Sequence, residues 1–313
     1  MTKNTCLLTG ILIVSGLLRA GAQSSSTADM YTSYQHYYSG LKFMPPGKSA
    51  MIQDLKDSTA LLADEASPAG NKIKLLPATT KALADEEIYA RRKSSVFIVG
   101  KLQKTVNSTD PLSFALTGTA FALNADGICV TNYHVLKGII VNDSPDAVKD
   151  SVYFIITWDK QLYFIEKILA YSQNNDLAVF KVNTNGNKLL PVPIGKPAEV
   201  GAAVYCISHP TGYFYYFSKG MVARNVTISA RQTAAGYNPL GKPPIRMEIT
   251  ADYGVGSSGG PVLDKRGNLV GIISATMPLG SMIKDDTGNV TGHQQMVIKD
   301  TLPVSALLEL LGN

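Results

Sequence analysis

From about residue 93 onwards, short apolar runs alternate with turns rich in Gly, Asn and Asp. The runs are rich in Val, Ile, Phe and Tyr, which is typical of strands that pack on a core. Six of them lie at residues 95–103, 113–123, 128–131, 151–158, 162–169 and 177–182. Six more lie at residues 202–208, 214–228, 244–250, 261–264, 269–275 and 294–297. Because no helical pattern separates these runs, we predict an all-β fold of two antiparallel six-stranded barrels, at about 93–183 and 195–300.

Helical periodicity is confined to the regions before and after the predicted barrels. Residues 49–66 carry apolar side chains at helical spacing. A second helix is predicted at residues 80–92, where acidic residues precede basic ones in the order that suits the helix dipole. A leucine-rich closing helix is predicted at residues 302–311. We therefore expect a partly helical N-terminal extension at residues 23–92 and a C-terminal helix after the second barrel.

The N-terminus has the layout of a secretory signal peptide. Lys3 supplies a positive charge, residues 6–18 form a mostly apolar run, and the small residues Ala20–Gly21–Ala22 follow. A membrane anchor is the alternative, but it requires about 20 apolar residues, and this run is shorter and ends at Arg19. We therefore expect cleavage after Ala22, which gives a secreted or periplasmic protein without a membrane span.

Composition and charge narrow the classes of function. The chain has 313 residues, of which 45% are hydrophobic and 17% charged, so it is long enough to bury a sizeable core. Removal of residues 1–22 takes away Lys3 and Arg19 and no acidic residue, which lowers the formal net charge from +5 to +3. This near-neutral charge, without a basic block, argues against a nucleic-acid partner. The histidines and cysteines lack metal-ligand spacing, so we expect no metal and no cofactor.

Two cysteines, Cys129 and Cys206, remain after the predicted cleavage. Export permits a disulfide. However, each cysteine lies in a separate apolar strand pattern, so we expect two buried free thiols.

A glycine-rich run at residues 256–261, Gly-Ser-Ser-Gly-Gly-Pro, can form a tight loop that exposes a hydroxyl and directs amide N–H groups to one point. Flexible loops have the same composition, so the run alone is weak evidence.

His134 follows one short strand and Asp176 begins another. Taken alone, His134 fits a structural role at a strand end, and Asp176 fits the role of a turn-forming residue. With Ser258 they give the order His, Asp, Ser at separations of 42 and 82 residues. Because strand ends of a double barrel meet at its seam, we predict Ser258 as the nucleophile, His134 as its base and Asp176 as the orienting group.

Three blocks of sequence around these residues resemble the trypsin-like serine proteases, and most of all the Deg/HtrA-type bacterial branch. The blocks are GTAFALNADGICVTNYHVL (118–136), NNDLAVFKV (174–182) and ADYGVGSSGGPVLDKRGNLVGI (251–272). The resemblance covers about residues 92–312, so we take residues 93–313 as a protease domain. It implies a serine endopeptidase that acts on protein or peptide substrates through an acyl-enzyme. It also implies that the backbone N–H groups of Gly256 and Ser258 form an oxyanion hole.

Two departures from the family's pattern limit what the resemblance implies. Ser257 stands where digestive trypsin-like enzymes carry an aspartate that pairs with a new N-terminus after zymogen cleavage. We therefore do not expect that activation switch, nor that residues 23–92 act as an ordinary activation peptide. Deg/HtrA proteins usually continue into a peptide-binding PDZ domain, whereas this sequence stops at Asn313. We therefore expect a protein without a PDZ domain.

The resemblance leaves the substrate preference open. In trypsin-like enzymes the residue six positions before the nucleophile floors the main substrate pocket, and here that position is Asp252. An acid there favours Lys or Arg before the scissile bond, but the Deg/HtrA branch usually has a small residue at this point. The alternative is an aspartate turned to solvent or capping its own loop. Ser274 is a second candidate for the substrate pocket.

Two other functions compete with that of a protease. Residues 256–260 also fit G-x-S-x-G, the nucleophile elbow of lipases and esterases. That elbow needs a following helix, whereas Pro261 and a short strand follow here, and the later candidates Asp285, Asp286 and His293 lie in a Gly-rich loop. The other alternative is a catalytically silent protein that binds unfolded or partner proteins, because a fold and a motif do not guarantee turnover. The intact set of three candidate residues favours the enzyme.

Overall fold

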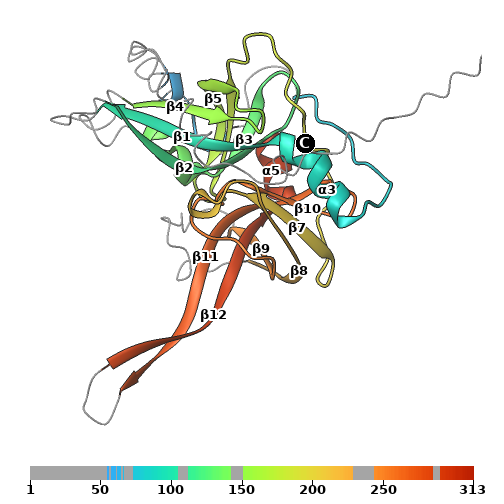
Figure 1. Cartoon of the computed structure of the whole chain (residues 1–313), viewed down its shortest axis with the longest axis vertical. Coiled ribbons are helices and arrows are strands. Elements are labelled where there is room, and N and C mark those ends of the chain that lie inside the picture. Colours follow the sequence, from blue (N-terminus) through green and yellow to red (C-terminus); the bar gives the residue numbers. More distant parts are fainter. Residues whose placement is uncertain are drawn as a thin grey trace, which may run out of the picture.

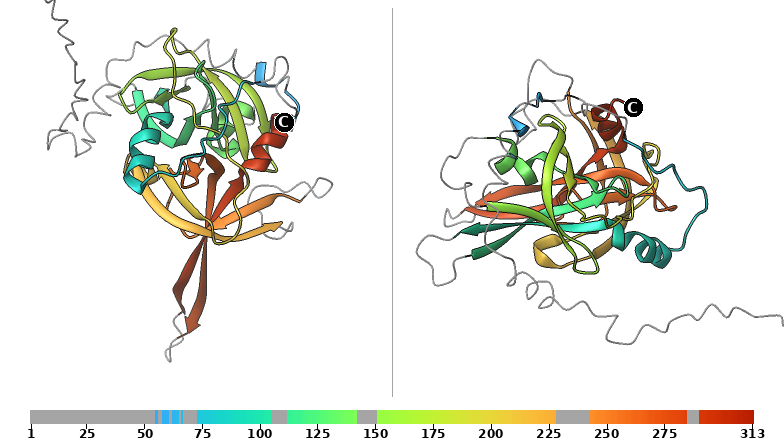
Figure 2. Two further views of the ribbon diagram at one scale, coloured as in Figure 1. Left: turned by 90° about the vertical axis from the view of Figure 1, so that its right-hand side faces the viewer. Right: turned by 90° about the horizontal axis from the view of Figure 1, so that it is seen from above.

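The computed structural model describes residues 73–104, 112–141, 151–227, 243–284 and 290–313, and a few positions between 55 and 66. The predicted signal peptide and most of the predicted first helix lie outside these described residues. Strands dominate, and they form two closed antiparallel barrels of six strands each (Figure 1). Figure 2 shows the two barrels stacked on each other. The predicted fold class is therefore confirmed. In the part of the chain described, no helix is long and apolar enough to cross a membrane.

Barrel one brings the end of β3 next to the start of β6. Its strands are β1 (Val96–Lys104), β2 (Leu112–Ala122), β3 (Ile128–Thr131), β4 (Ser151–Ile156), β5 (Leu162–Ser172) and β6 (Leu177–Val182). They close in the order β1-β2-β3-β6-β5-β4. The last residue of β3, Thr131, pairs with Ala178 near the start of β6. Because His134 follows β3 and Asp176 precedes β6, this pairing alone sets the two candidate residues close together. Phe97 and Phe180 are fully buried in the core behind them.

Barrel two carries the glycine-rich loop between two of its strands. The strands are β7 (Ala203–Ser208), β8 (Tyr216–Thr227), β9 (Ile245–Ile249), β10 (Pro261–Leu263), β11 (Leu269–Lys284) and β12 (Val290–Pro303), which close in the order β10-β11-β12-β9-β8-β7. The loop between β9 and β10 includes Ser258. It reaches barrel one, since the backbone N–H of Thr119 in β2 donates to the Ser258 carbonyl at 2.8 Å.

The segment before barrel one is bound to the turn between β10 and β11. It contains α3 (Asp85–Arg92) and the 3-10 turn η3 (Lys93–Ser95). The Arg92 side chain donates from Nε to the Gly267 carbonyl at 2.8 Å, and the backbone N–H of Leu83 donates to the Lys265 carbonyl at 2.9 Å. These bonds attach the C-terminal part of the N-terminal extension to barrel two, where Figure 1 shows α3 beside β7 and β10.

Three helices differ from the sequence prediction. α3 begins at Asp85 rather than at residue 80, because the preceding segment is bound to barrel two instead. α4 (Tyr133–Ile140) follows β3, where no helix was predicted; its buried face includes Leu136 and Ile139. α5 (Val304–Leu310) begins two residues later than predicted, because Leu302 and Pro303 still pair with β11.

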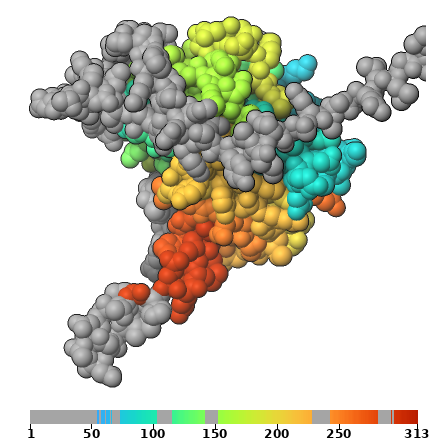
Figure 3. Space-filling model, viewed as in Figure 1, coloured from blue at the N-terminus to red at the C-terminus, as the bar shows by residue number. Residues whose placement is uncertain are grey.

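β11 and β12 extend beyond barrel two as a two-stranded ribbon (Figures 1 and 3). The sequence pattern predicts that the first of these strands ends at residue 275 and that the second begins at residue 294. The structure continues β11 to Lys284 and starts β12 at Val290. Pairing is maintained from Thr276↔Lys299 to Lys284↔Val290 with one shift after Leu279. The predicted strands were therefore too short.

Cys129 in β3 and Cys206 in β7 are free and buried, which confirms the expectation of two free thiols. Burial raises the pKa of both thiols, and that of Cys206 to about 12. Both side chains therefore act as small apolar groups in the two cores.

Candidate active site

His134 lies in the first turn of α4 and is held by Asp176 in two ways. Its backbone N–H donates to Oδ1 of Asp176 at 3.0 Å. Its ring atom Nδ1 lies 3.0 Å from Oδ1 and 2.9 Å from Oδ2 of the same carboxylate. The His134 side chain is 44% exposed. When Nδ1 carries the proton toward the carboxylate, the lone pair of the neutral ring lies on Nε2 and can accept a proton.

The neighbouring carboxylate raises the pKa of His134. Burial by itself lowers the pKa of the imidazole, because it disfavours the charged ring. The hydrogen bond and the negative charge of Asp176 act in the opposite direction and prevail. The site therefore stabilises the protonated ring, which is the state that a general base reaches during acyl transfer.

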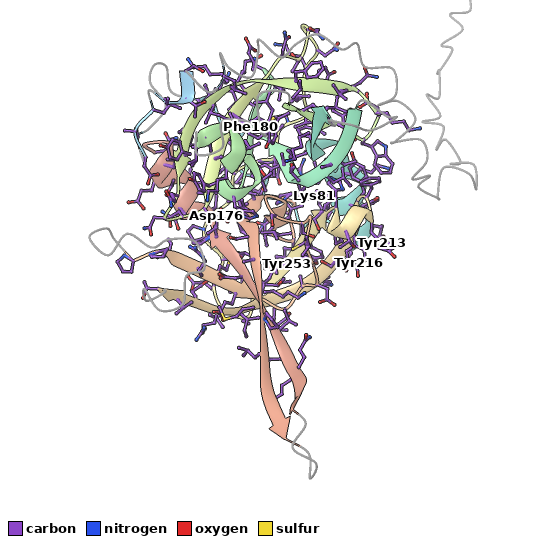
Figure 4. All side chains as sticks on the ribbon, turned by 90° about the vertical axis from the view of Figure 1, so that its left-hand side faces the viewer. Lys81, Asp176, Phe180, Tyr213, Tyr216 and Tyr253 are labelled. Atoms are coloured by element: carbon purple, nitrogen blue, oxygen red, sulfur yellow. The ribbon has the colours of Figure 1, made fainter. Side chains whose placement is uncertain are left out.

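Asp176 is fixed by donors from both barrels. Its backbone adopts a left-handed conformation (φ 52°) in the turn between β5 and β6, which an aspartate tolerates better than most residues. Nδ2 of Asn132 donates to its carbonyl at 2.9 Å. From barrel two, the Ser274 hydroxyl donates to Oδ2 at 2.7 Å. The side chain is 9% exposed, and Figure 4 shows Asp176 where the two barrels meet.

Gly259 allows the loop after Ser258 to pass closely between the barrels. Its backbone has φ +86°. A Cβ at this position would clash with the Thr119 carbonyl and the Thr131 hydroxyl of barrel one. Its N–H donates to the Ile273 carbonyl of β11 at 2.9 Å. The loop is therefore anchored on both sides, which sets the position of Ser258.

The Ser258 hydroxyl donates to the backbone carbonyl of Ser274 at 3.1 Å. Among the described residues, it makes no hydrogen bond to His134. Ser274 thus contacts both partners, because its side chain binds Asp176 and its carbonyl binds Ser258. The structure brings His134 and Asp176 into direct contact and connects Ser258 to them through Ser274.

The backbone N–H groups of Gly256 and Ser258 donate to no residue in the described part of the chain. Gly256 adopts φ +93°, and a Cβ there would lie 2.6 Å from the His209 carbonyl. Its own carbonyl accepts a hydrogen bond from the Thr119 hydroxyl at 2.8 Å. These contacts hold the loop while both amides stay available, as an oxyanion site requires.

Ser257 is fully buried and belongs to the loop's internal packing. The Ser208 hydroxyl lies 3.0 Å from that of Ser257, and the Gly254 N–H donates to Ser257 Oγ at 3.3 Å. A neutral hydroxyl therefore occupies the position at which digestive trypsin-like enzymes carry an aspartate. Ser257 itself is held by contacts within barrel two.

Of the two sequence candidates for the substrate pocket, Asp252 points to solvent and Ser274 lies beside Ser258. The Asp252 side chain is 79% exposed and lies 3.4 Å from the Lys299 ammonium. The structure therefore does not place it on the floor of a pocket. Ser274 is bound to Asp176 and Ser258 as described above. Tyr253, which follows Asp252 in the chain, is buried. It was not among the residues predicted from the sequence.

His209 is a buried polar residue near the site. It was not predicted as a site residue from the sequence. The backbone N–H of Tyr215 donates to its Nδ1 at 2.9 Å. Burial lowers the pKa of His209 to about 3, so the ring is neutral. The sequence does carry one sign that His209 lies near the site. It comes directly after strand β7, just as His134 comes shortly after β3.

Comparison with known proteins agrees with this architecture. A family model described as "Trypsin-like peptidase domain" matches residues 118–272. Protease Do-like 1 of Arabidopsis thaliana is 31% identical over 163 residues, which are 51% of this chain and 33% of the relative. A probable periplasmic serine endoprotease DegP-like of Brucella suis is 29% identical over 160 residues, covering 50% of this chain and 27% of that protein. This chain thus spans about a third or less of the length of these two relatives.

A solved structure, an HtrA-type protease AlgW with decapeptide, has a TM-score of 0.53 and 19% identity to this chain. The match covers 74% of this chain and 67% of the other. At this identity it supports the fold alone. Taken together with the double barrel, the comparisons show that this chain carries a trypsin-like peptidase domain and has Deg/HtrA proteases as relatives.

Proposed function

We propose that this protein is a serine endopeptidase that hydrolyses peptide bonds through an acyl-enzyme on Ser258. The observation that carries the proposal is the double role of Ser274, which joins Asp176 and Ser258 within one site beside His134. The relatives named above are proteases. The solved HtrA-type protease of the same fold is described with a decapeptide, which supports protein or peptide substrates.

The reaction begins with a rotation of the Ser258 side chain, which moves its hydroxyl from the Ser274 carbonyl toward Nε2 of His134. His134 takes the hydroxyl proton while Oγ attacks the carbonyl carbon of the substrate. The C–N bond then breaks, and the same proton passes from His134 to the leaving amine. A water molecule next gives a proton to His134 and attacks the acyl carbon, and the proton returns to Oγ as the ester bond breaks. Asp176 keeps the ring oriented and stabilises its charged form throughout.

Negative charge develops on the substrate's carbonyl oxygen in both steps. The N–H groups of Gly256 and Ser258 are the donors that the loop leaves available for it. Loss of one such donor typically costs about 3 kcal/mol of transition-state stabilisation. This role explains why the loop is held by contacts that do not use these two amides.

The remaining assignments follow the same proposal. We assign residues 1–22 to a signal peptide, residues 23–92 to an N-terminal extension and residues 93–313 to the protease domain. The signal layout supports a secreted or periplasmic location, and the Brucella relative is named as periplasmic.

One observation favours a second candidate, a catalytically silent protein that binds other polypeptides. It is the hydroxyl of Ser258, which is bonded to Ser274 rather than to His134 among the described residues. In the enzyme this is a resting state that substrate replaces. In a silent protein it would persist.

Labelling with a fluorophosphonate probe tests the proposal. We expect the purified protein to be labelled and to cut casein, and Ser258→Ala to lose both properties. Ser305→Ala in α5 is the matched control and should keep both. A folded parent protein that is neither labelled nor able to cut casein would support the silent binder. Label retained by Ser258→Ala would show that another serine reacts.

A further inference from the structure

One of the two proposed oxyanion donors is held from behind by the loop between β7 and β8. The donor is the backbone N–H of Gly256, which shares a planar peptide unit with the carbonyl of Val255. In a trans peptide unit, which this is, the carbonyl and the N–H point in opposite directions. The backbone N–H of Thr211 donates to the Val255 carbonyl at 2.6 Å. This hydrogen bond therefore sets the direction in which the Gly256 N–H points.

The loop that supplies this hydrogen bond has a strained backbone. It begins at His209, contains the 3-10 turn η4 (Pro210–Gly212) and ends at Tyr215. Thr211 has φ 45° and Tyr215 has φ 58°, in the left-handed region that β-branched and bulky residues rarely adopt. Such conformations persist only where the surrounding structure holds them. The position of the Thr211 N–H therefore depends on what the loop packs against.

The ring of Tyr215 anchors the loop in the protein interior. Tyr215 is buried, and its ring meets that of His209 edge to face, with 4.7 Å between the ring centres. The Tyr215 N–H also donates to Nδ1 of His209 at 2.9 Å. Tyr213 of the same loop is instead 61% exposed and lies at the surface (Figure 4). The His209 carbonyl packs directly against Gly256, where no Cβ would fit. A displacement of Tyr215 would therefore be transmitted to Gly256.

A side chain of barrel one packs against this anchor. Trp158, in the turn between β4 and β5, meets the Tyr215 ring at an angle of 83°, with 4.6 Å between the ring centres. Edge-to-face aromatic pairs of this kind are attractive beyond the apolar area that they bury. Lys93 of η3 places its ammonium 4.0 Å from the centre of the Trp158 ring, and tryptophan is the best aromatic partner for a cation. A continuous row of contacts therefore leads from Lys93 through Trp158, Tyr215 and His209 to Gly256.

We propose that Trp158 is a positioning residue, which holds the peptide unit between Val255 and Gly256 in the orientation that receives the substrate's oxyanion. The inference rests on the proposed endopeptidase function and adds a residue to its site. Without the indole, Tyr215 loses its partner on barrel one and the strained loop can relax. The Thr211 N–H then moves away from the Val255 carbonyl, and the Gly256 N–H is no longer held in its direction. Because only the transition state carries the oxyanion, the loss affects kcat rather than substrate binding.

The test compares Trp158→Leu with Trp158→Phe on a peptide chosen from the parent protein's own casein digest. Trp158→Leu should lower kcat by about 10- to 100-fold with little change in KM, because a displacement of about 1 Å can cost this much. The affinity for a peptidyl trifluoromethyl ketone of the same sequence should fall by the same factor, since its hemiketal oxygen occupies the place of the oxyanion. Trp158→Phe keeps a ring against Tyr215 and should recover most of both quantities.

Variants of Lys93 test the same row of contacts without altering the core. Lys93→Met should lower kcat and the affinity for the ketone by about two- to fivefold, which corresponds to the loss of one exposed contact between a cation and a ring. Lys93→Arg keeps the cation and should match the parent protein. These two variants decide the question if Trp158→Leu does not fold, and equal kcat values in them would then overturn the inference.

The remaining outcomes separate this inference from the proposed function. A folded Trp158→Leu with the parent's kcat and ketone affinity would overturn the role of Trp158 and leave the protease intact. A lower kcat with unchanged ketone affinity would overturn it as well, because the loss would then lie outside the oxyanion donors. A parent protein that neither cuts casein nor reacts with fluorophosphonate would instead overturn the proposed function itself.

Discussion

Ser274 on barrel two donates its hydroxyl across the seam to the carboxylate of Asp176 on barrel one, over 2.7 Å. Both residues are buried, with exposures of 6% and 7%. A hydrogen bond to a charged group in such a place is worth more than one between neutral groups. The bond therefore does two things at once: it orients the carboxylate beside His134, and it holds the two barrels in a fixed relation.

Replacing Ser274 with Ala should weaken both effects. We expect the free energy of unfolding to fall by about 1.5–3 kcal/mol, which is typical for the loss of a bond to a charged group. In the proposed enzyme, kcat should fall while KM changes little, because the carboxylate position affects the chemical step. Ser274→Thr keeps a hydroxyl and is the control. Denaturant unfolding and peptide hydrolysis measure the two effects, and equal loss in both variants would argue against the hydroxyl's role.

The pH profile of hydrolysis should report the raised pKa of His134. A protonated ring cannot accept the Ser258 proton, so kcat/KM should fall on acidification, with a midpoint above the ordinary value of 6.5. Asp176→Asn removes the charge that raises this pKa, so the midpoint should move down. Its kcat should drop by about 10⁴-fold, because the ring is then held in the wrong tautomer. A profile from about pH 5 to pH 9 measures both; an unchanged midpoint in Asp176→Asn would remove Asp176 from the site.

The same shift in the pKa of His134 has the opposite effect on stability. The folded state favours the protonated ring more than the unfolded state does. Its contribution to stability is therefore fully present below the unfolded pKa and is lost as pH rises through the folded pKa. Activity and this part of the stability thus change in opposite directions over the same pH window.

The barrels and the three candidate residues could be predicted because both depend on local patterns. Runs of β-branched and aromatic residues mark the strands, and the order of His134, Asp176 and Ser258 marks their ends. α4 could not be predicted, because its eight residues contain Val135, Ile139 and Ile140, which also suit a strand. The segment is helical because its apolar face packs on barrel one, which the sequence pattern does not show.

The long ribbon and the lining of the site depend on contacts that the sequence does not reveal. Pro278 and Gly280 interrupt the strand pattern of β11, yet pairing with β12 continues past both. Whether Asp252 or Tyr253 faces the barrel depends on one step along the loop, and a one-residue shift exchanges the two faces. The role of Ser274 requires knowing that β11 passes beside the turn of the other barrel that contains Asp176.

Gly259→Ala should destabilise the protein strongly. The backbone at this position has φ +86°, and an added Cβ would clash with main-chain and side-chain oxygens of Thr119 and Thr131. Backbone atoms cannot move aside cheaply, so we expect a loss of more than about 4 kcal/mol. Gly186→Ala is the matched control, because it has φ +87° with nothing within 4 Å of the added Cβ. It should lose only about 1–2 kcal/mol. Similar melting temperatures for the two variants would contradict the close passage of the loop between the barrels.

His209 should make the fold sensitive to acid. Burial lowers its pKa to about 3 from an ordinary value of 6.5. Between these two values, His209 binds a proton in the unfolded state but not in the folded state. The stability that neutral His209 contributes is therefore lost as pH falls from 6.5 toward 3. The loss is about 1.4 kcal/mol for each pH unit. His209→Asn keeps an acceptor for the Tyr215 N–H but does not titrate, so urea unfolding should show a smaller acid loss in the variant. Burial also raises the pKa of Asp300 to about 6, but this group is present in both proteins and cancels in the comparison. Equal acid losses in the two proteins would mean that His209 is not buried as a neutral ring.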